Sequence, residues 1–212
     1  MTLSVAMCEV GMLPTNCYLV QDTSSGQSLL VDPGFYDLPL RQMLRRAKIK
    51  SLDYILLTHG HYDHILGAKP VKEQYGGKVV IFAEEEPFLR DTSLSLVKPF
   101  LSEYPQLDAA DILVHDGDTL PFGDGEIRVL HTPGHTSGSV CYLLNDLLFC
   151  GDTLFCCSAG RTDLPTGDFN TLMRSLQKIA ALDGNFRVLP GHDRTSTLDY
   201  ERNNNPYLQT VL

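Results

Sequence analysis

The fold and the chemistry expected of this chain depend on the segment Thr58-His59-Gly60-His61-Tyr62-Asp63-His64. It follows residues 52–58, an apolar run that predicts a buried strand, and it opens residues 63–75, whose apolar spacing predicts a helix. His59 and His61 stand at positions i and i+2 of a chain leaving a strand, so both rings can be aimed at one point. Asp63 and His64 start the predicted helix, whose N-terminus also favours a carboxylate. The segment therefore predicts one side of a metal site.

Three later segments carry a histidine or an aspartate beside a glycine where an apolar strand is predicted to end. They are His131-Thr132-Pro133-Gly134-His135-Thr136, Cys150-Gly151-Asp152-Thr153 and Leu189-Pro190-Gly191-His192-Asp193. Glycine lets the backbone turn sharply, so the neighbouring side chain can be presented at a sheet edge. We therefore expect these segments to complete the metal site.

A count of these ligands predicts two divalent metal ions. Imidazole and carboxylate groups suit zinc, which is the first expectation, with iron and manganese as alternatives. Two ions held about 3.5–4 Å apart would share a hydroxide nucleophile. A lone H-x-H pair is more often a pair of ordinary loop histidines, but the three later strand-end segments favour a metal centre. The predicted ligands are His59, His61 and His135 for one ion, Asp63, His64 and His192 for the other, and Asp152 as the bridge.

Composition narrows the function further. The chain has 212 residues, which fits one domain over residues 1–212, and 43% are hydrophobic, which suffices for a core. A formal net charge of -9 argues against a nucleic-acid partner, because binding phosphate backbones depends on Lys and Arg. No segment approaches the roughly 18 apolar residues of a membrane span, and six cysteines without a C-x-x-C pair are expected to be reduced. We expect a cytoplasmic protein that acts on a small molecule, of unpredicted oligomeric state.

Patterns along the rest of the chain predict two sheet-rich halves, each finished by helices. Such halves suggest a layered α/β sandwich rather than a Rossmann fold. Residues 92–111 have weak periodicity and predict an irregular lid or a helical insertion. Further strands are predicted at 3–10, 16–21, 27–32, 78–83, 112–115, 118–122, 126–131, 139–144, 147–151 and 186–189. Further helices are predicted at 37–48, at 84–90, from Asp168 as N-cap to 182, and from about 195 onward.

The motifs THGHYDH, TPGHT, GDTLF and PGH resemble those of the metallo-β-lactamase fold superfamily, and the resemblance covers almost the whole chain. The resemblance implies a four-layer αββα sandwich, of class α/β (α+β), with the metals between the sheet edges at one end. Residues 151–167 and Glu201-Arg202-Asn203, followed by Asn205-Pro206, are most similar to the glyoxalase II (hydroxyacylglutathione hydrolase) group, particularly its short bacterial members.

The glyoxalase II resemblance implies hydrolysis of a hydroxyacyl thioester, and two departures leave the thiol carrier open. Asp163 and Arg194 stand where that family has tyrosines. The sequence also ends soon after His192, whereas full-length glyoxalase II continues into a helical domain that helps to hold glutathione. We expect Arg161 to grip a substrate carboxylate, because its guanidinium can make two parallel charge-assisted bonds. A salt bridge to Asp163 or Asp168 is the alternative role for Arg161, while Thr162 and Arg194 are weaker substrate-binding candidates.

Thioester chemistry also fits the residues themselves. The leaving group is a thiolate with a pKa of about 8.5, so little acid assistance is required. A metal-bound water titrates near neutrality and supplies hydroxide, which Asp63 can orient as a hydrogen-bond acceptor while it binds metal. Asp63 is therefore the predicted catalytic residue.

Three other functions are compatible with the sequence. A mononuclear iron persulfide dioxygenase shares the fold and would use two histidines and a carboxylate, such as His59, His135 and Asp152. Another metallo-hydrolase, such as a lactonase, is a third reading, and a non-catalytic binding protein that kept the fold is a fourth.

Overall fold

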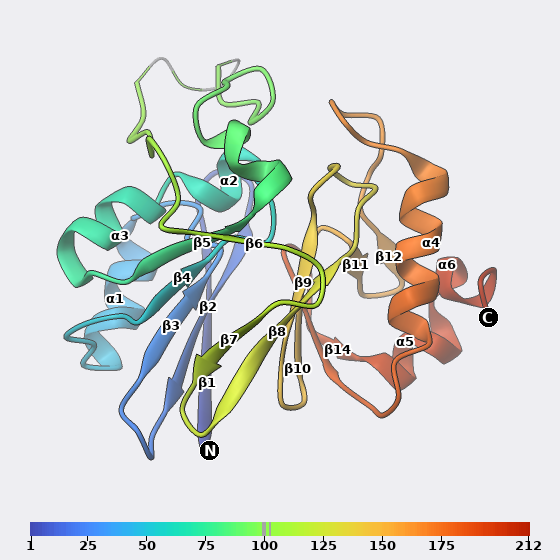
Figure 1. The fold of residues 1–212 in the computed structure, drawn as a ribbon, viewed down its shortest axis with the longest axis horizontal. Coiled ribbons are helices and arrows are strands. Elements are labelled where there is room, and N and C mark those ends of the chain that lie inside the picture. The colour runs from blue at the N-terminus through green and yellow to red at the C-terminus, as the bar shows by residue number, and fades with distance from the viewer. Residues whose placement is uncertain (99–100, 102) are drawn as a thin grey trace.

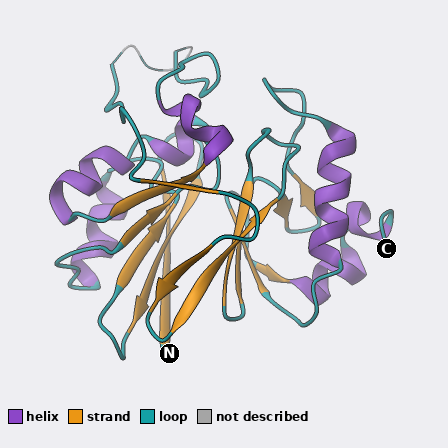
Figure 2. Ribbon diagram, in the orientation of Figure 1, coloured by secondary structure: helices purple, strands orange, loops and turns teal. Residues whose placement is uncertain are grey.

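A computed structural model describes residues 1–98, 101 and 103–212, and in this part of the chain two six-stranded sheets lie face to face between helices (Figures 1 and 2). The first sheet has the strand order β1-β2-β3-β4-β5-β6. Its first three strands are antiparallel, and β3 to β6 run parallel to one another. The strands are β1 (Leu3–Val10), β2 (Thr15–Asp22), β3 (Ser28–Val31), β4 (Tyr54–Leu56), β5 (Lys78–Phe82) and β6 (Ile112–Val114).

The second sheet has the order β14-β13-β10-β9-β8-β7. Strand β8 is antiparallel to β9, β9 is antiparallel to β10, and β10 is parallel to β13. Strands β8, β10 and β13 therefore point the same way and end at the same edge. The strands are β7 (Thr119–Phe122), β8 (Gly125–His131), β9 (Val140–Leu144), β10 (Leu147–Gly151), β13 (Arg187–Pro190) and β14 (Ser196–Thr197), and β11 (Leu154–Phe155) pairs separately with β12 (Ser158–Ala159).

Helices cover the outer faces of both sheets (Figure 1). Helices α1 and α3 lie against the first sheet, and α4, α5 and α6 lie on the side of the second. Within residues 1–98, 101 and 103–212, no helix is both long enough and apolar enough to span a membrane. The helices are α1 (Leu38–Arg46), α2 (Tyr62–Ile65), α3 (Ala68–Tyr75), the 3-10 helix η1 (Ala83–Leu89), α4 (Phe169–Ala180), α5 (Leu198–Asn204) and α6 (Pro206–Gln209).

Three apolar clusters fill the three interfaces between four layers, which are two sheets and the helices outside each sheet. Alternation along β2 shows why: Leu19 packs with α1 and α3, whereas its neighbours Tyr18 and Val20 face the second sheet. The third cluster joins the second sheet to its helices, as where Leu148 packs with Leu172. Two helical layers outside two sheets require three such interfaces. The predicted αββα sandwich is confirmed.

The predicted single helix over residues 63–75 is wrong. Helix α2 ends at Ile65, and α3 begins only at Ala68. At Gly67 the backbone packs so closely that a Cβ would lie 2.3 Å from the carbonyl oxygen of Pro33, and its N–H donates to the Gly34 carbonyl rather than continuing the helix. A contact with a residue more than thirty positions away therefore breaks the periodic pattern.

Other boundaries shift for local reasons. The helix expected at 84–90 is the 3-10 helix η1, which contains Pro87, a residue without an N–H to donate. Residues 196–197 form strand β14, so the helix expected from about 195 begins at Leu198, with Thr197 as its N-cap. The prediction that Asp168 is an N-cap is confirmed, because its carboxylate accepts a hydrogen bond from the Thr171 N–H at the start of α4. Residues 92–98, 101 and 103–111 are irregular as expected, and residues 99, 100 and 102 of that prediction lie outside the described residues.

A buried carboxylate, that of Glu85, links one loop of the first sheet to one loop of the second by hydrogen bonds. Glu85, in η1 after β5, has no exposed surface. Its Oε2 accepts from Gly60 N–H at 2.7 Å, after β4, and its Oε1 accepts from Gly138 N–H at 2.8 Å, in the loop between β8 and β9. Burial raises the pKa of the Glu85 carboxyl to about 7. One side chain thus fixes the separation of two loops that belong to different sheets.

Glu85→Gln should lower the free energy of unfolding by about 1–3 kcal/mol, because the new NH₂ group must face a backbone N–H and leaves a buried donor unpaired. Chemical denaturation of wild type and variant measures the difference. Glu84→Gln is the matched control, since Glu84 is exposed, and it should stay within about 0.5 kcal/mol of wild type. Equal stability of the Glu85 and Glu84 variants would show that the two hydrogen bonds of Glu85 contribute nothing to the free energy of unfolding.

Candidate metal centre

The predicted ligands meet at one edge of the sandwich because strand direction brings them there. His59, His61, Asp63 and His64 follow β4, whose carboxyl end lies beside those of its parallel neighbours β3 and β5. The second sheet contributes one ligand after each of its three strands of common direction. His135 follows β8, Asp152 follows β10 and His192 follows β13. All seven predicted ligands are brought together from two sheets.

Three imidazoles form the first group. His59 Nε2 lies 3.1 Å from His61 Nδ1, which lies 2.9 Å from His135 Nε2. All three side chains are buried. Burial, and after it the neighbouring histidines, holds the pKa of His59 well below its usual value, and burial lowers that of His61 to about 3. The rings of His59 and His61 are therefore held neutral, which is the form that binds a metal ion.

Asp63, His64 and His192 form the second group. Asp63 Oδ2 lies 3.6 Å from His64 Nε2 and 3.3 Å from His192 Nε2. Asp152 lies between the two groups: its Oδ1 is 3.4 Å from His64 Nε2, and its Oδ2 is 3.5 Å from His135 Nε2. Within each of the sets His59-His61-His135, His59-His64-Asp152 and Asp63-His64-His192, one ligand atom per residue lies within 4.8 Å of the others.

Hydrogen bonds on the far side of the rings set their orientation. His135 Nδ1 donates to the carbonyl oxygen of Arg161 at 2.8 Å, and His192 Nδ1 donates to that of Pro14 at 3.0 Å. His64 Nδ1 lies 3.0 Å from the Asp32 carboxylate. With Nδ1 occupied in each ring, the Nε2 lone pair faces the centre, as in metal-bound histidines.

The donor set fits a divalent cation. His64 Nε2 and Asp152 Oδ1 are buried without a hydrogen-bond partner among the described residues, although such atoms are costly to leave unpaired. Burial lowers the pKa of His64, but Asp63, Asp152 and Asp32 outweigh it and raise that pKa to about 10. Asp63 and Asp152 lie 3.6 and 3.4 Å from Nε2 and attract positive charge to it, and a metal ion there would replace the proton. Nitrogen and carboxylate donors suit zinc, iron or manganese.

Three supporting residues were missed from the sequence. Asp32, which directly follows β3, accepts from the backbone N–H and the hydroxyl of Thr58 in addition to holding His64. Thr15 donates from its hydroxyl to Asp63 Oδ2 at 3.1 Å. Glu85 fixes the loops of His61 and His135 through the two glycine N–H groups. A signal existed for Asp32, since it is an acid at the end of a buried apolar run, like Asp152.

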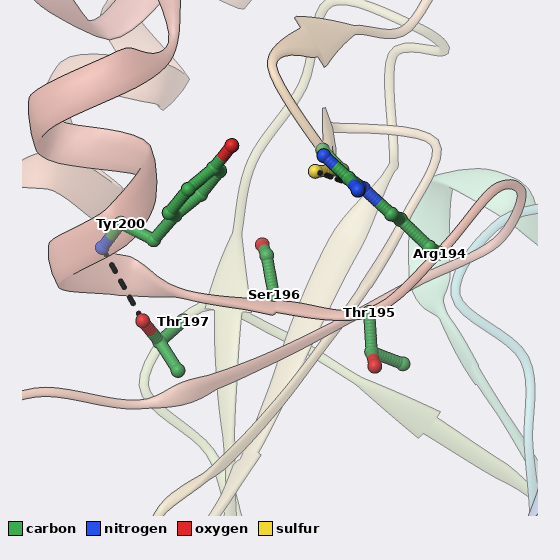
Figure 3. A pocket seen from close by; sticks show the side chains of 6 residues that line it. Arg194, Thr195, Ser196, Thr197 and Tyr200 are labelled. Atoms are coloured by element: carbon green, nitrogen blue, oxygen red, sulfur yellow. Dashed lines mark hydrogen bonds between the residues drawn. The ribbon is translucent and has the colours of Figure 1, made fainter.

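The expected substrate-binding residues lie outside the ligand cluster. Arg161 makes a bidentate ion pair with Asp163, with both nitrogen–oxygen distances 2.7 Å, which is one of the two alternatives for this side chain. Thr162 lies half-buried between these partners. Arg194 lines a pocket of about 450 Å³ together with Tyr200 (Figure 3). Phe155, which precedes the pocket residue Cys156 in the chain, packs edge-on against the ring of His192 with centroids 6.0 Å apart.

Curated relatives cover nearly the full length of the chain. An uncharacterized protein of Mycobacterium leprae (strain TN) is 38% identical over 94% of this chain and 95% of its own. The probable metallo-hydrolase YqgX of Bacillus subtilis (strain 168) is 34% identical over 94% of each. The hydroxyacylglutathione hydrolase GloC of Haemophilus influenzae (strain ATCC 51907 / DSM 11121 / KW20 / Rd) is 29% identical over 98% of this chain and 99% of its own.

Solved structures agree with the fold. The BLEG-1 B3 metallo-beta-lactamase has a TM-score of 0.89 and 32% identity, covering 97% of this chain and 99% of its own. TTHA1623 in a di-iron-bound form has a TM-score of 0.81 and 32% identity, covering 96% and 100%. ETHE1 from Myxococcus xanthus has a TM-score of 0.77 and 28% identity, covering 96% and 83%. The model of the Metallo-beta-lactamase superfamily matches residues 10–192, and the chain belongs to that superfamily.

Proposed function

We propose that this protein hydrolyses the thioester of a small thiol carrier at a centre of two divalent metal ions. The observation that carries the proposal is the position of Asp152 between the two ligand groups. Its Oδ1 lies 3.4 Å from His64 Nε2, and its Oδ2 lies 3.5 Å from His135 Nε2 and 3.6 Å from His192 Nε2. A carboxylate so placed can bridge two ions, and His59-His61-His135 and Asp63-His64-His192 supply three ligands for each. Zinc is the proposed metal, and the likeness to a protein solved in a di-iron-bound form supports iron as the alternative.

Bound metal ions supply a water nucleophile at neutral pH and polarise the substrate carbonyl. The chain itself orients the reactants. Asp63 Oδ2, fixed by the Thr15 hydroxyl, can accept a hydrogen bond from the water and hold its lone pair toward the carbonyl carbon. The leaving thiolate has a pKa of about 8.5 and needs no strong acid, which favours a thioester over an amide or an alkyl ester.

The relatives support hydrolysis more than any one substrate. One is named a hydroxyacylglutathione hydrolase, one a probable metallo-hydrolase, and one similar structure a metallo-beta-lactamase. The chemistry of the thiol carrier is therefore best inferred from the side chains near the centre. We propose Arg161, which is exposed and paired with Asp163, and Arg194, which lines the pocket, as the basic groups for a substrate with an acidic end. Thr162, next to Arg161 in the chain, is a weaker candidate.

A mononuclear iron persulfide dioxygenase is the second candidate, with His59, His135 and Asp152 as its ligands. The distance of 3.5 Å between His135 Nε2 and Asp152 Oδ2 would let both side chains bind one ion. Asp63 and His64, which are buried, and the partly exposed His192 would then have no role in such a reaction, which is why we place hydrolysis first.

His61→Ala should lower thioester hydrolysis by more than about 100-fold and remove metal from the centre, because a ligand of the first group is lost. The protein should still unfold cooperatively, since His61 belongs to none of the three apolar clusters. Turnover and elemental analysis of the purified variant measure both effects. His115→Ala, at an exposed histidine away from the centre, is the control. Wild-type turnover in metal-replete His61→Ala protein would contradict the ligand assignment.

Arg161→Ala should raise KM for thioesters with an acidic end by about 10-fold or more and change kcat little, because a charge-assisted hydrogen bond to substrate is lost. The His135 ring stays in place, since it bonds the backbone oxygen of residue 161. Steady-state kinetics with acidic and neutral thioesters separate the effects, and Arg174→Ala, at an exposed arginine of α4, is the control. An unchanged KM would assign Arg161 to its ion pair with Asp163 alone.

A thioester panel, including glutathione and other low-molecular-weight thiol carriers, separates the two candidate functions when it is run with metal analysis and an oxygen electrode. We expect two metal ions at the histidine centre, thioester turnover and no sulfur-dependent oxygen uptake. One iron per chain together with persulfide-dependent oxygen uptake would replace the thioesterase by the dioxygenase.

A further inference from the structure

A second group of metal-binding side chains lies beside the pocket and outside the histidine centre. Cys156 and Cys157 form the turn between β11 and β12, and Glu201 reaches them from α5. The two Sγ atoms and a carboxylate oxygen lie within 4.8 Å of one another. We propose that Cys156, Cys157 and Glu201 bind a thiophilic divalent cation such as Zn²⁺ or Cd²⁺ at a site of its own.

Glu201 is the first argument for a cation. Its side chain has no exposed surface. Oε2 accepts from Cys157 N–H at 2.8 Å and from Asn205 Nδ2 at 2.9 Å, which holds the carboxylate against the turn. Oε1 is also buried but has no hydrogen-bond partner among the described residues. A buried carboxylate oxygen without a partner is costly, and a cation between it and the thiols would remove that cost.

The charges around the thiols also balance. Two thiolates and one carboxylate carry three negative charges, so a divalent cation leaves one negative charge in excess. The guanidinium of Arg194 lies where that excess would be, with Nε donating to Cys156 Sγ at 3.1 Å (Figure 3). On binding, each thiol releases its proton to solvent, and two sulfur–metal bonds and one oxygen–metal bond form.

The dimensions suit such an ion. Zinc lies about 2.3 Å from sulfur and 2.0–2.2 Å from oxygen, so its tetrahedral ligands are about 3.5–3.8 Å apart. A cluster with separations up to 4.8 Å must contract by about 1.3 Å at most, which rotation of two half-buried cysteine side chains supplies. Cys156 lines the pocket of about 450 Å³ with Arg194 and Tyr200, so the ion has a path from solvent and a fourth position for water.

A reactive thiol is the competing role for this turn. Burial raises the pKa of the Cys156 thiol, against the opposing hydrogen bond from Arg194. Reactive cysteines have lowered pKa values, so an isolated nucleophile or redox sensor fits this environment poorly. Metal binding fits it better, because the cation itself displaces the thiol protons.

Titration of Cd²⁺ into protein loaded with two Zn²⁺ per chain, enough for the histidine centre alone, tests the proposal through the near-ultraviolet sulfur-to-cadmium charge-transfer band. Imidazole and carboxylate ligands do not produce this band, so the histidine centre does not contribute. We expect the band to saturate near one Cd²⁺ per chain and to disappear in Cys156→Ser and in Cys157→Ser. Cys8→Ser removes a half-buried thiol on β1 and is the matched control, which should keep the band.

Glu201→Gln should weaken Cd²⁺ binding by about 10-fold or more, because a neutral amide oxygen is a poorer ligand than a carboxylate. If this variant does not fold, the serine variants still decide the question. Absence of the band in wild type, its persistence at wild-type strength in both serine variants, or its loss in Cys8→Ser would overturn the site.

Discussion

The structure depends on one electrostatic constraint: nitrogen and oxygen lone pairs are held 2.9–3.6 Å apart in a site largely removed from solvent. The imidazoles of His59 and His61, which burial holds neutral, repel each other where their lone pairs converge, and buried carboxylates are costly unless they are paired. A divalent cation turns each of these unfavourable terms into an attraction. The donor atoms are therefore best understood as a preformed cage whose stability belongs to the metal-bound state.

The sandwich supplies the rigidity that this cage requires. Parallel strands β3, β4 and β5 end beside one another, as do β8, β10 and β13, so the donors of each sheet arrive at a common edge. Buried acids then fix the loops that leave those ends. Asp32 holds Thr58 and His64 within the first sheet, and Glu85 joins the loops of both sheets through two backbone N–H groups. Removing a ligand should thus affect the metal more than the fold.

Strand-end motifs made the convergence of the seven predicted ligands foreseeable from the sequence, whereas the residues that hold these side chains in place were not foreseeable. His135, Asp152 and His192 each stand beside a glycine after an apolar run, which is a local pattern. The role of Glu85 appears only when loops from two sheets meet on it, and locally it is one of three consecutive glutamates. The break in the helix at Gly67 has the same origin, since Pro33 and Gly34 approach from a distant part of the chain. The hydrophobic periodicity of the sequence does not show which sheet edges will meet.

The central claim is that Asp152 bridges two metal ions between the two ligand groups. Crystallography of metal-loaded protein, with anomalous difference maps at the zinc and iron absorption edges, tests it most directly. The account predicts two peaks about 3.5–4 Å apart. One should lie among His59, His61 and His135, the other should be bound by Asp63, His64 and His192, and Asp152 should touch both. A single peak with Asp63, His64 and His192 turned away from it, or no peak at these residues, would contradict the account.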